Sequence, residues 1–310
     1  MIYDIVGDVH GGFDPLRQLF RKLGYRLRND YWHPPNGRQA IFVGDIVDRG
    51  REVRRCVRAV RRMVEEGHAQ MVVGNHEWLL IRYTSKQHDG HWRVPHNRMV
   101  HSVLENTFRS YAGMTDQLWE DIRWLRQQPL WLEWPHFRVA HACWHDDDVS
   151  LLRQACPENC LSEAFMQKFD QWNPPLFDAL ERLLVGPKWT IPEGWAQPKI
   201  HYFRPGSLRY KWWLSPHRHT LAELDTMYLN LPDDHPLPAH LRPPDYSYPP
   251  NAKPLFIGHY CLTPPVSLLR PNLAPVDFCV LRNGVQTAYR FEGESVLQEN
   301  HYVRGKQGFL

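Results

Sequence analysis

Three short motifs that combine acids, histidines and amides follow one another within the first 77 residues. They are Gly7-Asp8-Val9-His10-Gly11, Gly44-Asp45-Ile46-Val47-Asp48-Arg49-Gly50 and Gly74-Asn75-His76-Glu77. Each motif stands directly after a short apolar run, which places it at the end of a buried strand. Carboxylate, imidazole and amide side chains gathered in this way are what a pair of divalent metal ions requires. The three motifs together therefore predict a metal site.

Five apolar runs would position these motifs and two further histidines. The runs cover residues 2–6, 40–43, 71–73, 137–140 and 255–257. They are short and rich in Val, Ile and Phe, which is typical of strands buried on both faces. Helical patterns separate the first three runs, so parallel pairing is expected. Because ligands bind beyond the carboxyl ends of parallel strands, His141 and His259, which follow the last two runs, are expected at the same rim of the sheet.

The types of donor limit the choice of metal. Mixed oxygen and nitrogen ligands suit manganese, iron or zinc better than calcium, which prefers oxygen alone. No cysteine belongs to the set, which argues against a structural zinc site. Asp45 could bridge two ions about 4 Å apart, the spacing used in two-metal hydrolysis. Taken singly, His141 and His259 could equally be core histidines, and only the joint pattern makes them ligands.

Composition bounds the class of protein. The chain has 310 residues and a formal net charge of +3, a small excess that does not by itself argue for nucleic acid, and no nucleic-acid partner is expected. No signal peptide is expected, and no run of about 18 apolar residues suggests a membrane span. The six cysteines are spread out and are expected as reduced thiols in a cytoplasmic protein. The oligomeric state stays open.

The second half of the chain departs from the regular strand–helix pattern. Asn283-Gly284 lies between alternating runs, which predicts a hairpin and an antiparallel end to the fold. The stretch at about 187–253 is rich in Pro, Trp, Tyr and His and has little periodicity. It is interpreted as a long insertion over the core, so that residues 1–310 form one domain.

The three motifs match a known set in full. They resemble the Gly-Asp-x-His-Gly, Gly-Asp-x-x-Asp-Arg-Gly and Gly-Asn-His-Glu motifs of the calcineurin-like metallophosphoesterases, and within them the bacterial type of the phosphoprotein phosphatase branch. The Asp-Arg pair at 48 and 49 distinguishes that branch from looser relatives. The resemblance implies an α/β fold with a central β-sandwich of mixed sheets flanked by helices. It is specific over residues 1–80 and absent from the insertion.

The resemblance implies ligands for two divalent metal ions. The first ion would be held by Asp8, His10 and Asp45, and the second by Asp45, Asn75, His141 and His259. Tyr260, rather than a second histidine, follows His259, so the first ion would have three protein ligands. Manganese is the expected metal, with iron, zinc or nickel as alternatives.

The resemblance also implies which residues handle the substrate. His76 would be the general acid, held by Asp48, because a histidine outside the metal shell can protonate a leaving alkoxide. Arg49 would grip the phosphate, since a guanidinium pairs with two phosphate oxygens, and Asn75 would contact it too. Glu77 could orient a ligand or merely favour the start of a helix.

A second phosphate-binding arginine is expected between the last two histidine ligands. Arg204, Arg209 and Arg218 are all candidates. Arg209 is favoured because the neighbouring Lys211-Trp212-Trp213 is typical of a strand.

These roles predict hydrolysis of phosphate esters by in-line attack of a metal-bridging hydroxide. The first expectation is a Ser/Thr protein phosphatase-like enzyme acting on a phosphoprotein. The alternative is a dinucleoside polyphosphate hydrolase or another nucleotide phosphoesterase, and departures from the branch at Val73 and Ala142-Cys143 leave the substrate open. A nuclease of the wider superfamily is a weaker alternative. An alternative of another class is a nucleic-acid-binding or scaffold protein with a structural metal site. Such a site would need neither His76 nor Arg49.

Overall fold

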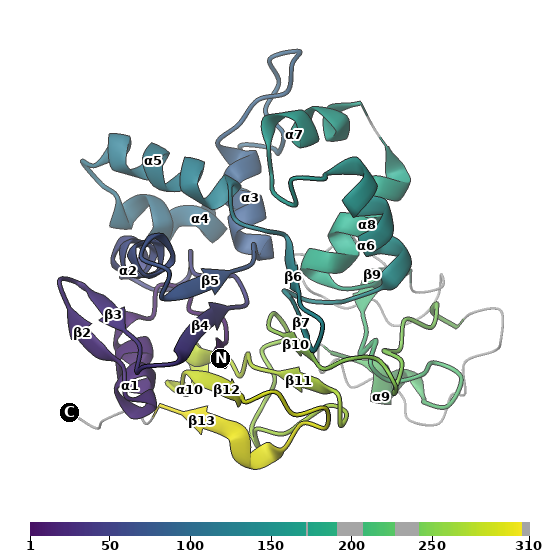
Figure 1. The fold of residues 1–310 in the computed structure, drawn as a ribbon. Coiled ribbons are helices and arrows are strands. Elements are labelled where there is room, and N and C mark those ends of the chain that lie inside the picture. Colours follow the sequence, from purple (N-terminus) through teal and green to yellow (C-terminus); the bar gives the residue numbers. More distant parts are fainter. Residues whose placement is uncertain (172, 191–206, 227–241, 306–310) are drawn as a thin grey trace.

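Strands from both ends of the chain form the first of two central sheets (Figure 1). In spatial order they are β13 (Tyr302–Arg304), β12 (Thr287–Phe291), β1 (Ile2–Val6), β4 (Arg38–Phe42) and β5 (Ala69–Met71). The last three pair in parallel, whereas β12 and β13 pair antiparallel with their neighbours. The parallel part follows the predicted strand–helix–strand pattern, so the ends of its strands share one edge.

The second sheet packs against the first. In spatial order its strands are β11 (Leu273–Pro275), β10 (Leu255–Ile257), β7 (Arg138–Ala140) and β6 (Trp131–Glu133). One hydrophobic cluster joins the two sheets, with Ile5 and Ile41 from the first and Val139 and Phe256 from the second. The predicted α/β fold with a sandwich of mixed sheets is therefore confirmed.

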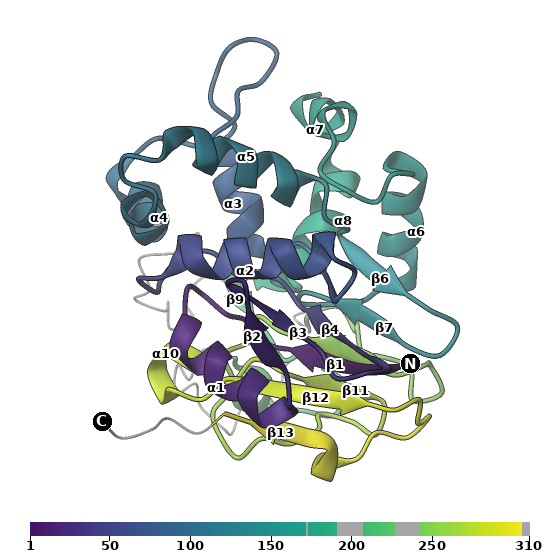
Figure 2. The same cartoon turned by 60° about the vertical axis from the view of Figure 1, so that its left-hand side comes forward.

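Helices flank the sandwich. Those before residue 130 are α1 (Phe13–Leu23), α2 (Val53–Glu65), α3 (Asn75–Tyr83), α4 (Arg98–Ser110) and α5 (Thr115–Arg126). The buried side of α2 carries Val53, Val57 and Val60, as its helical period requires. Because α2 packs against β5 while α4 and α5 pack against α2, these helices stand together above the strands in Figure 2.

Shorter elements complete the described chain, which comprises residues 1–171, 173–190, 207–226 and 242–305 of this computed structural model. The remaining helices are α6 (Asp146–Ala155), α7 (Glu163–Asp170), α8 (Pro174–Val185), α9 (Leu221–Leu224), α10 (Val280–Asn283) and the 3-10 helix η2 (Glu299–His301). Two strand pairs are β2 (Arg26–Arg28) with β3 (Tyr31–His33) and β8 (Lys188–Thr190) with β9 (Ser207–Arg209). Much of the predicted insertion at 187–253 lies outside the described residues. In the ranges that are described, every helix is too short or too polar to cross a membrane.

The hairpin predicted at Asn283-Gly284 is wrong. Asn283 ends α10, and Gly284 caps that helix in the left-handed conformation at φ 66°. The run before this pair contains α10 rather than a strand, and the run after it joins the first sheet as β12. Asn-Gly favours positive φ both in a two-residue hairpin and at a helix end, so the dipeptide alone cannot distinguish them.

The expectation of six reduced thiols is also wrong. Cys261 and Cys279 form a disulfide, and their Cα atoms lie 4.4 Å apart. The first follows β10 and the second follows β11, and these strands are paired neighbours, so residues 18 apart in sequence meet. No local spacing marks such a pair, because the contact depends on strand pairing. The other four cysteines are free.

Candidate metal centre

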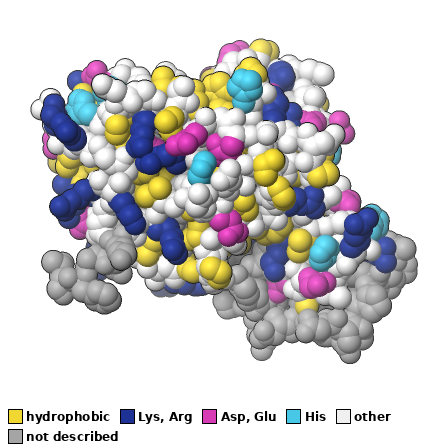
Figure 3. All heavy atoms as spheres, turned by 60° about the horizontal axis from the view of Figure 1, so that its bottom comes forward, with side chains coloured by type: hydrophobic (Ala, Val, Ile, Leu, Met, Phe, Trp, Pro, Cys, Tyr) yellow, Lys and Arg dark blue, Asp and Glu magenta, His cyan; other side chains and the backbone are white. Residues whose placement is uncertain are grey.

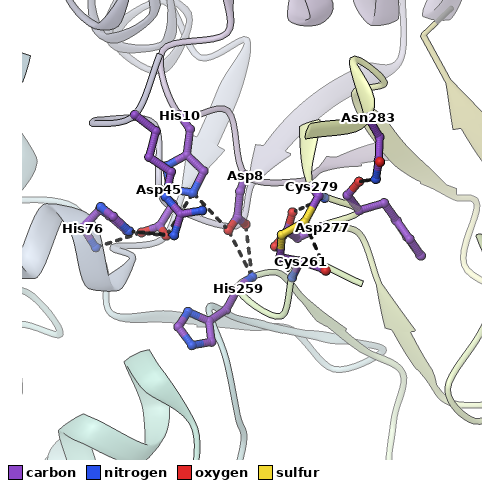
Figure 4. The surroundings of a disulfide bond; sticks show 11 residues. Asp8, His10, Asp45, His76, His259, Cys261, Asp277, Cys279 and Asn283 are labelled. Atoms are coloured by element: carbon purple, nitrogen blue, oxygen red, sulfur yellow. Dashed lines mark hydrogen bonds and ion pairs between the residues drawn. A yellow bond between two sulfur atoms is a disulfide. The ribbon is translucent and has the colours of Figure 1, made fainter. Parts of the chain in front are cut away.

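Five strand ends meet at one edge of the sandwich. They lead into Asp8, Asp45 and Asn75 after β1, β4 and β5, and into His141 and His259 after β7 and β10. The sequence predicted a single rim, but these strands belong to two sheets. The predicted ligands therefore come together only because the two sheets pack face to face. Figure 4 shows Asp45 between His76 and His10, and Asp8 on the other side of His10 with the main chain of His259 against it.

The Asp45 carboxylate lies at the centre of this cluster. Its Oδ2 is 3.4 Å from Nε2 of His141, 3.6 Å from Nε2 of His10 and 3.9 Å from Nε2 of His76. The residue is 1% exposed. Burial alone would raise the pKa of Asp45, but the neighbouring histidines outweigh burial and hold that pKa well below its usual value. A buried anion surrounded by imidazoles is suited to bridging two cations.

Backbone carbonyls set the direction of two imidazoles. Nδ1 of His10 donates to the carbonyl of Val47 at 3.0 Å, and Nδ1 of His141 donates to that of Val43 at 2.7 Å. Each ring therefore turns Nε2 toward Asp45. Burial, followed by the charge of His76, lowers the pKa of His10 to about 3, which leaves its Nε2 as an acceptor.

The pocket around His141 favours positive charge. Burial alone would lower the pKa of His141, but Asp45 outweighs burial and raises that pKa to about 10. A fully buried imidazole that holds an extra proton is therefore balanced by the carboxylate beside it. A divalent cation would meet the same electrostatic demand.

Asp8 and Asn75 complete the set of predicted ligands. Oδ2 of Asp8 lies 3.8 Å from Nε2 of His10, and the carboxylate accepts the backbone N–H of His259 at 3.1 Å. Oδ1 of Asn75 lies 3.0 Å from Nε2 of His141 and 2.7 Å from Nδ1 of His259. All six predicted ligands thus lie in one cluster, while their binding of metal stays a prediction.

His76, the predicted general acid, contacts Asp48, which is predicted to hold it. Nδ1 of His76 donates to Oδ2 of Asp48 at 2.8 Å, and Nη2 of Arg49 lies 3.4 Å from Nε2 of His76. Burial alone would lower the pKa of His76, but Asp45 and Asp48 outweigh burial and raise that pKa above its usual value. A ring nitrogen of His76 also lies within 4.8 Å of a ligand atom of His10 and of Asp45. The geometry therefore permits either a proton donor or a ligand at this position.

Arg209 reaches the cluster from β9, inside the predicted insertion. Its Nη1 donates a hydrogen bond to Nε2 of His259. Burial lowers the pKa of Arg209, and the charge of Arg49 lowers it further. Of the other candidates, Arg218 is exposed and Arg204 lies outside the described residues.

Glu77 fixes the backbone of the second motif. Its fully buried carboxylate accepts four backbone N–H groups. The donors are Asp45 at 2.8 Å, Ile46 at 2.8 Å, Val47 at 3.1 Å and Gly74 at 2.9 Å. Of the two roles that the sequence left open, this contact supports the orienting of a ligand, because Asp45 is held by its own main chain.

Strained backbone accompanies these contacts. Five site residues have positive φ although they are not glycine: His10 at 44°, Asp45 at 49°, Asp48 at 65°, Arg49 at 60° and His259 at 70°. Such conformations persist only where the surroundings hold them, and they concentrate at functional sites.

Two glycines let the main chain approach the carboxylates. A Cβ at Gly74 would overlap Oδ1 of Asp45, and a Cβ at Gly258 would overlap Oδ1 of Asp8. A larger residue at either position would displace a predicted metal ligand. Glycine is required here by the site rather than by a turn.

Asp277 is a buried acid that no sequence motif marks. Its carboxylate accepts the backbone N–H of Cys261 at 2.6 Å and that of Cys279 at 3.0 Å, on both sides of the disulfide (Figure 4). Burial raises the pKa of Asp8, and the charge of Asp277 raises it further. Asp277 thus fixes the turn just after His259 and adds negative charge to the site.

The residues present fit a pair of divalent cations. The cluster combines buried carboxylates, imidazoles and an amide oxygen, and its two donor groups, His10–Asp45–His76 and Asp45–His141–His259, share one carboxylate. This mixed set suits manganese, iron or zinc better than calcium. The fold and the site together define the class of metal-dependent phosphoesterases.

The chain belongs to the calcineurin-like phosphoesterase family, whose model matches residues 1–221. It is similar to the asymmetrical bis(5'-nucleosyl)-tetraphosphatase PrpE of Halalkalibacterium halodurans, with 31% identity over 156 residues that cover 48% of this chain and 60% of that protein. The PrpE of Oceanobacillus iheyensis is 42% identical over 149 residues, which cover 46% of this chain and 56% of that protein. The matched part thus spans 60% or less of these relatives.

Solved structures share this fold. The cold-active protein-tyrosine phosphatase of a psychrophile Shewanella superimposes with a TM-score of 0.50 and 18% identity, covering 96% of this chain and 80% of that chain. At this identity the likeness concerns the fold alone.

Proposed function

We propose that this site hydrolyses a phosphate ester or anhydride with the help of two divalent cations. The observation that carries the proposal is the buried Asp45 carboxylate, which both donor groups share. One cation would be held by Asp8, His10 and Asp45, and the other by Asp45, Asn75, His141 and His259. When bound, such cations supply Lewis-acid charge and an activated water at neutral pH.

The remaining side chains would handle the phosphate and the proton. Arg49 and Arg209 would pair with phosphoryl oxygens, on which charge develops during transfer. His76 would donate a proton to the leaving oxygen from Nε2, because its Nδ1 is bound to Asp48. The two neighbouring carboxylates raise the pKa of His76 above its usual value, which favours the protonated ring.

For the substrate we propose a dinucleoside polyphosphate, in place of the phosphoprotein that was expected first. The names of the curated relatives, asymmetrical bis(5'-nucleosyl)-tetraphosphatases, support this choice. Two guanidinium groups beside one cluster also suit a polyphosphate, which offers several charged oxygens.

Helix α2 is rich in arginine. Its charge does not support a nucleic-acid-binding or scaffold role. Several of its arginines are paired with acids, in Glu52–Arg55, Arg61–Glu65 and Arg62–Glu66. On the face drawn in Figure 3, Lys and Arg side chains likewise lie among acidic and apolar ones. Balanced charge of this kind is typical of a solvated surface.

The test uses full-length protein stripped with a chelator and reloaded with Mn²⁺. Diadenosine tetraphosphate, a phosphothreonine peptide and 4-nitrophenyl phosphate are compared side by side. Activity should return with the metal, and kcat/KM should be highest on diadenosine tetraphosphate. A preference for the phosphopeptide would overturn the proposed substrate. Absence of activity on all three with manganese, iron, nickel and zinc would overturn the proposed reaction.

Arginine variants test the phosphate contacts. Arg209→Ala should lower kcat/KM by at least about tenfold, because it removes a charged donor to the phosphate. Arg218→Ala is the matched control, since Arg218 is exposed on the same stretch of chain. Equal effects of the two substitutions would contradict the role of Arg209.

A further inference from the structure

Helix α4 reaches Asp48 and Arg49 from outside the three motifs. The Thr107 hydroxyl donates to Oδ1 of Asp48, and Oγ1 of Thr107 accepts the backbone N–H of Asp48 at 3.0 Å. Thr107 is 0% exposed. One residue earlier, Nδ2 of Asn106 donates to the carbonyl of Arg49 at 2.7 Å. Two consecutive residues of α4 therefore hold two consecutive residues of the second motif.

These bonds hold a backbone that is strained. Asp48 and Arg49 both have positive φ, which non-glycine residues keep only where neighbours fix them. Glu77 fixes the first part of the motif through the N–H groups of residues 45–47. The second part is fixed by α4.

The two oxygens of Asp48 have different partners. Oδ1 accepts the Thr107 hydroxyl, and Oδ2 accepts Nδ1–H of His76 at 2.8 Å. The carboxylate cannot rotate about its Cβ–Cγ bond without breaking the bond to Thr107. The orientation of the His76 ring is therefore set by α4 through Asp48.

We propose that Thr107 is a positioning residue for proton transfer from His76, acting through Asp48. This inference rests on the proposed function. As the oxygen of a water molecule bonds to phosphorus and the bond between phosphorus and the leaving oxygen breaks, the leaving oxygen takes the proton from Nε2 of His76. The proton that the water loses passes to solvent, and solvent later returns a proton to the ring. Thr107 and Asp48 keep their protonation states throughout. Their part is to hold the ring so that Nε2 faces the leaving oxygen.

The test compares phosphate monoesters whose leaving groups differ in basicity. The phenolate released from 4-nitrophenyl phosphate is weakly basic and needs little protonation, whereas that from phenyl phosphate is more basic and gains more from an acid. Thr107→Val keeps the shape of the side chain but lacks the hydroxyl. Its kcat should fall at least about tenfold more on phenyl phosphate than on 4-nitrophenyl phosphate. Thr107→Ser, which keeps the hydroxyl, should restore the wild-type ratio.

Ser110 offers a matched control on the same helix. Its Oγ accepts the backbone N–H of Arg54 at 2.9 Å, so Ser110→Ala removes a similar anchor without touching Asp48. The ratio of the two esters should stay unchanged in Ser110→Ala. In metal-free protein, hydrogen exchange of the Asp48 amide should accelerate in Thr107→Val and not in Ser110→Ala.

Several results would overturn the inference. An equal fall on both esters in Thr107→Val would do so, as would the same change of ratio in Ser110→Ala or unchanged exchange of the Asp48 amide. Should Thr107→Val fail to fold, Thr107→Cys carries the same comparison, because a thiol is a weaker donor. An inactive wild-type protein would instead count against the proposed function itself.

Discussion

Replacing Glu77 by Gln should strongly destabilise the fold, because one carboxylate serves four backbone amides. Oε1 accepts the N–H groups of Ile46 and Val47, and Oε2 accepts those of Asp45 and Gly74. A Gln side chain keeps one acceptor oxygen and turns an NH₂ group toward the other two amides. Two bonds to a charged acceptor are lost, each contributing about 1.5–3 kcal/mol, so the free energy of unfolding should fall by about 3–6 kcal/mol.

Urea unfolding followed by tryptophan fluorescence measures this change. Burial, ahead of the charge of Asp45, raises the pKa of Glu77, so the measurement belongs on the alkaline side of neutrality, where the carboxylate is more fully ionised. Glu52→Gln is the control, because Glu52 only accepts a surface bond from Arg55 at 2.9 Å, and it should change stability by less than about 1 kcal/mol.

The same variant should also bind manganese about tenfold or more weakly, since Asp45 loses the anchor of its main chain. Calorimetric titration of the metal-free protein checks this second effect. If Glu77→Gln destabilises by less than about 1 kcal/mol, the four backbone N–H groups find other hydrogen-bond acceptors, and the reasoning is refuted.

Three further predictions follow from the same contacts. His76→Asn should lower kcat/KM by at least about 100-fold while the metal content per chain, measured by atomic absorption, stays unchanged; loss of metal would make His76 a ligand instead. Burial alone would raise the pKa of Glu133, but bonds from three basic side chains, led by Lys253, outweigh burial and lower it to about 2. Because that pKa lies below the usual 4.5, the stabilisation is present at neutral pH and is lost as the pH falls from 4.5 toward 2. With allowance for its partial exposure, Glu133→Gln should destabilise by about 1–2 kcal/mol at neutral pH and by nothing near pH 2, which urea unfolding at both values decides. Finally, thiol titration of the denatured, unreduced protein should find the 4 free cysteines only, and reaction of all six would disprove the bond between Cys261 and Cys279.

Much of the cluster could be predicted from the sequence because its residues directly follow strands. A short apolar run identifies a buried strand, and parallel pairing brings the ends of such strands to one edge. Asp8, Asp45 and Asn75 are therefore placed by chain position alone. Asp48 and His76 belong to the same motifs. Their contact at 2.8 Å is the one expected between a general acid, His76, and the carboxylate that orients it, Asp48.

Local sequence was ambiguous where one residue pattern serves two structures. Asn283-Gly284 ends a helix instead of turning a hairpin, because positive φ is needed in both cases. Glu77 could be read as a helix-start carboxylate or as an anchor. Only its four amide partners, three of them about 30 residues earlier in the chain, distinguish these roles.

The sequence by itself determined the three motifs, the strands that carry them and the chemical types of the donors. The tertiary structure alone decided that two sheets, rather than one, bring His141 and His259 to Asp45. It also decided that Thr107 holds Asp48 and that Asp277 fixes the turn beside the disulfide. The physical reason is that these contacts join segments far apart in sequence. They form through the packing of helices and sheets, for which no local periodicity or turn preference carries a signal.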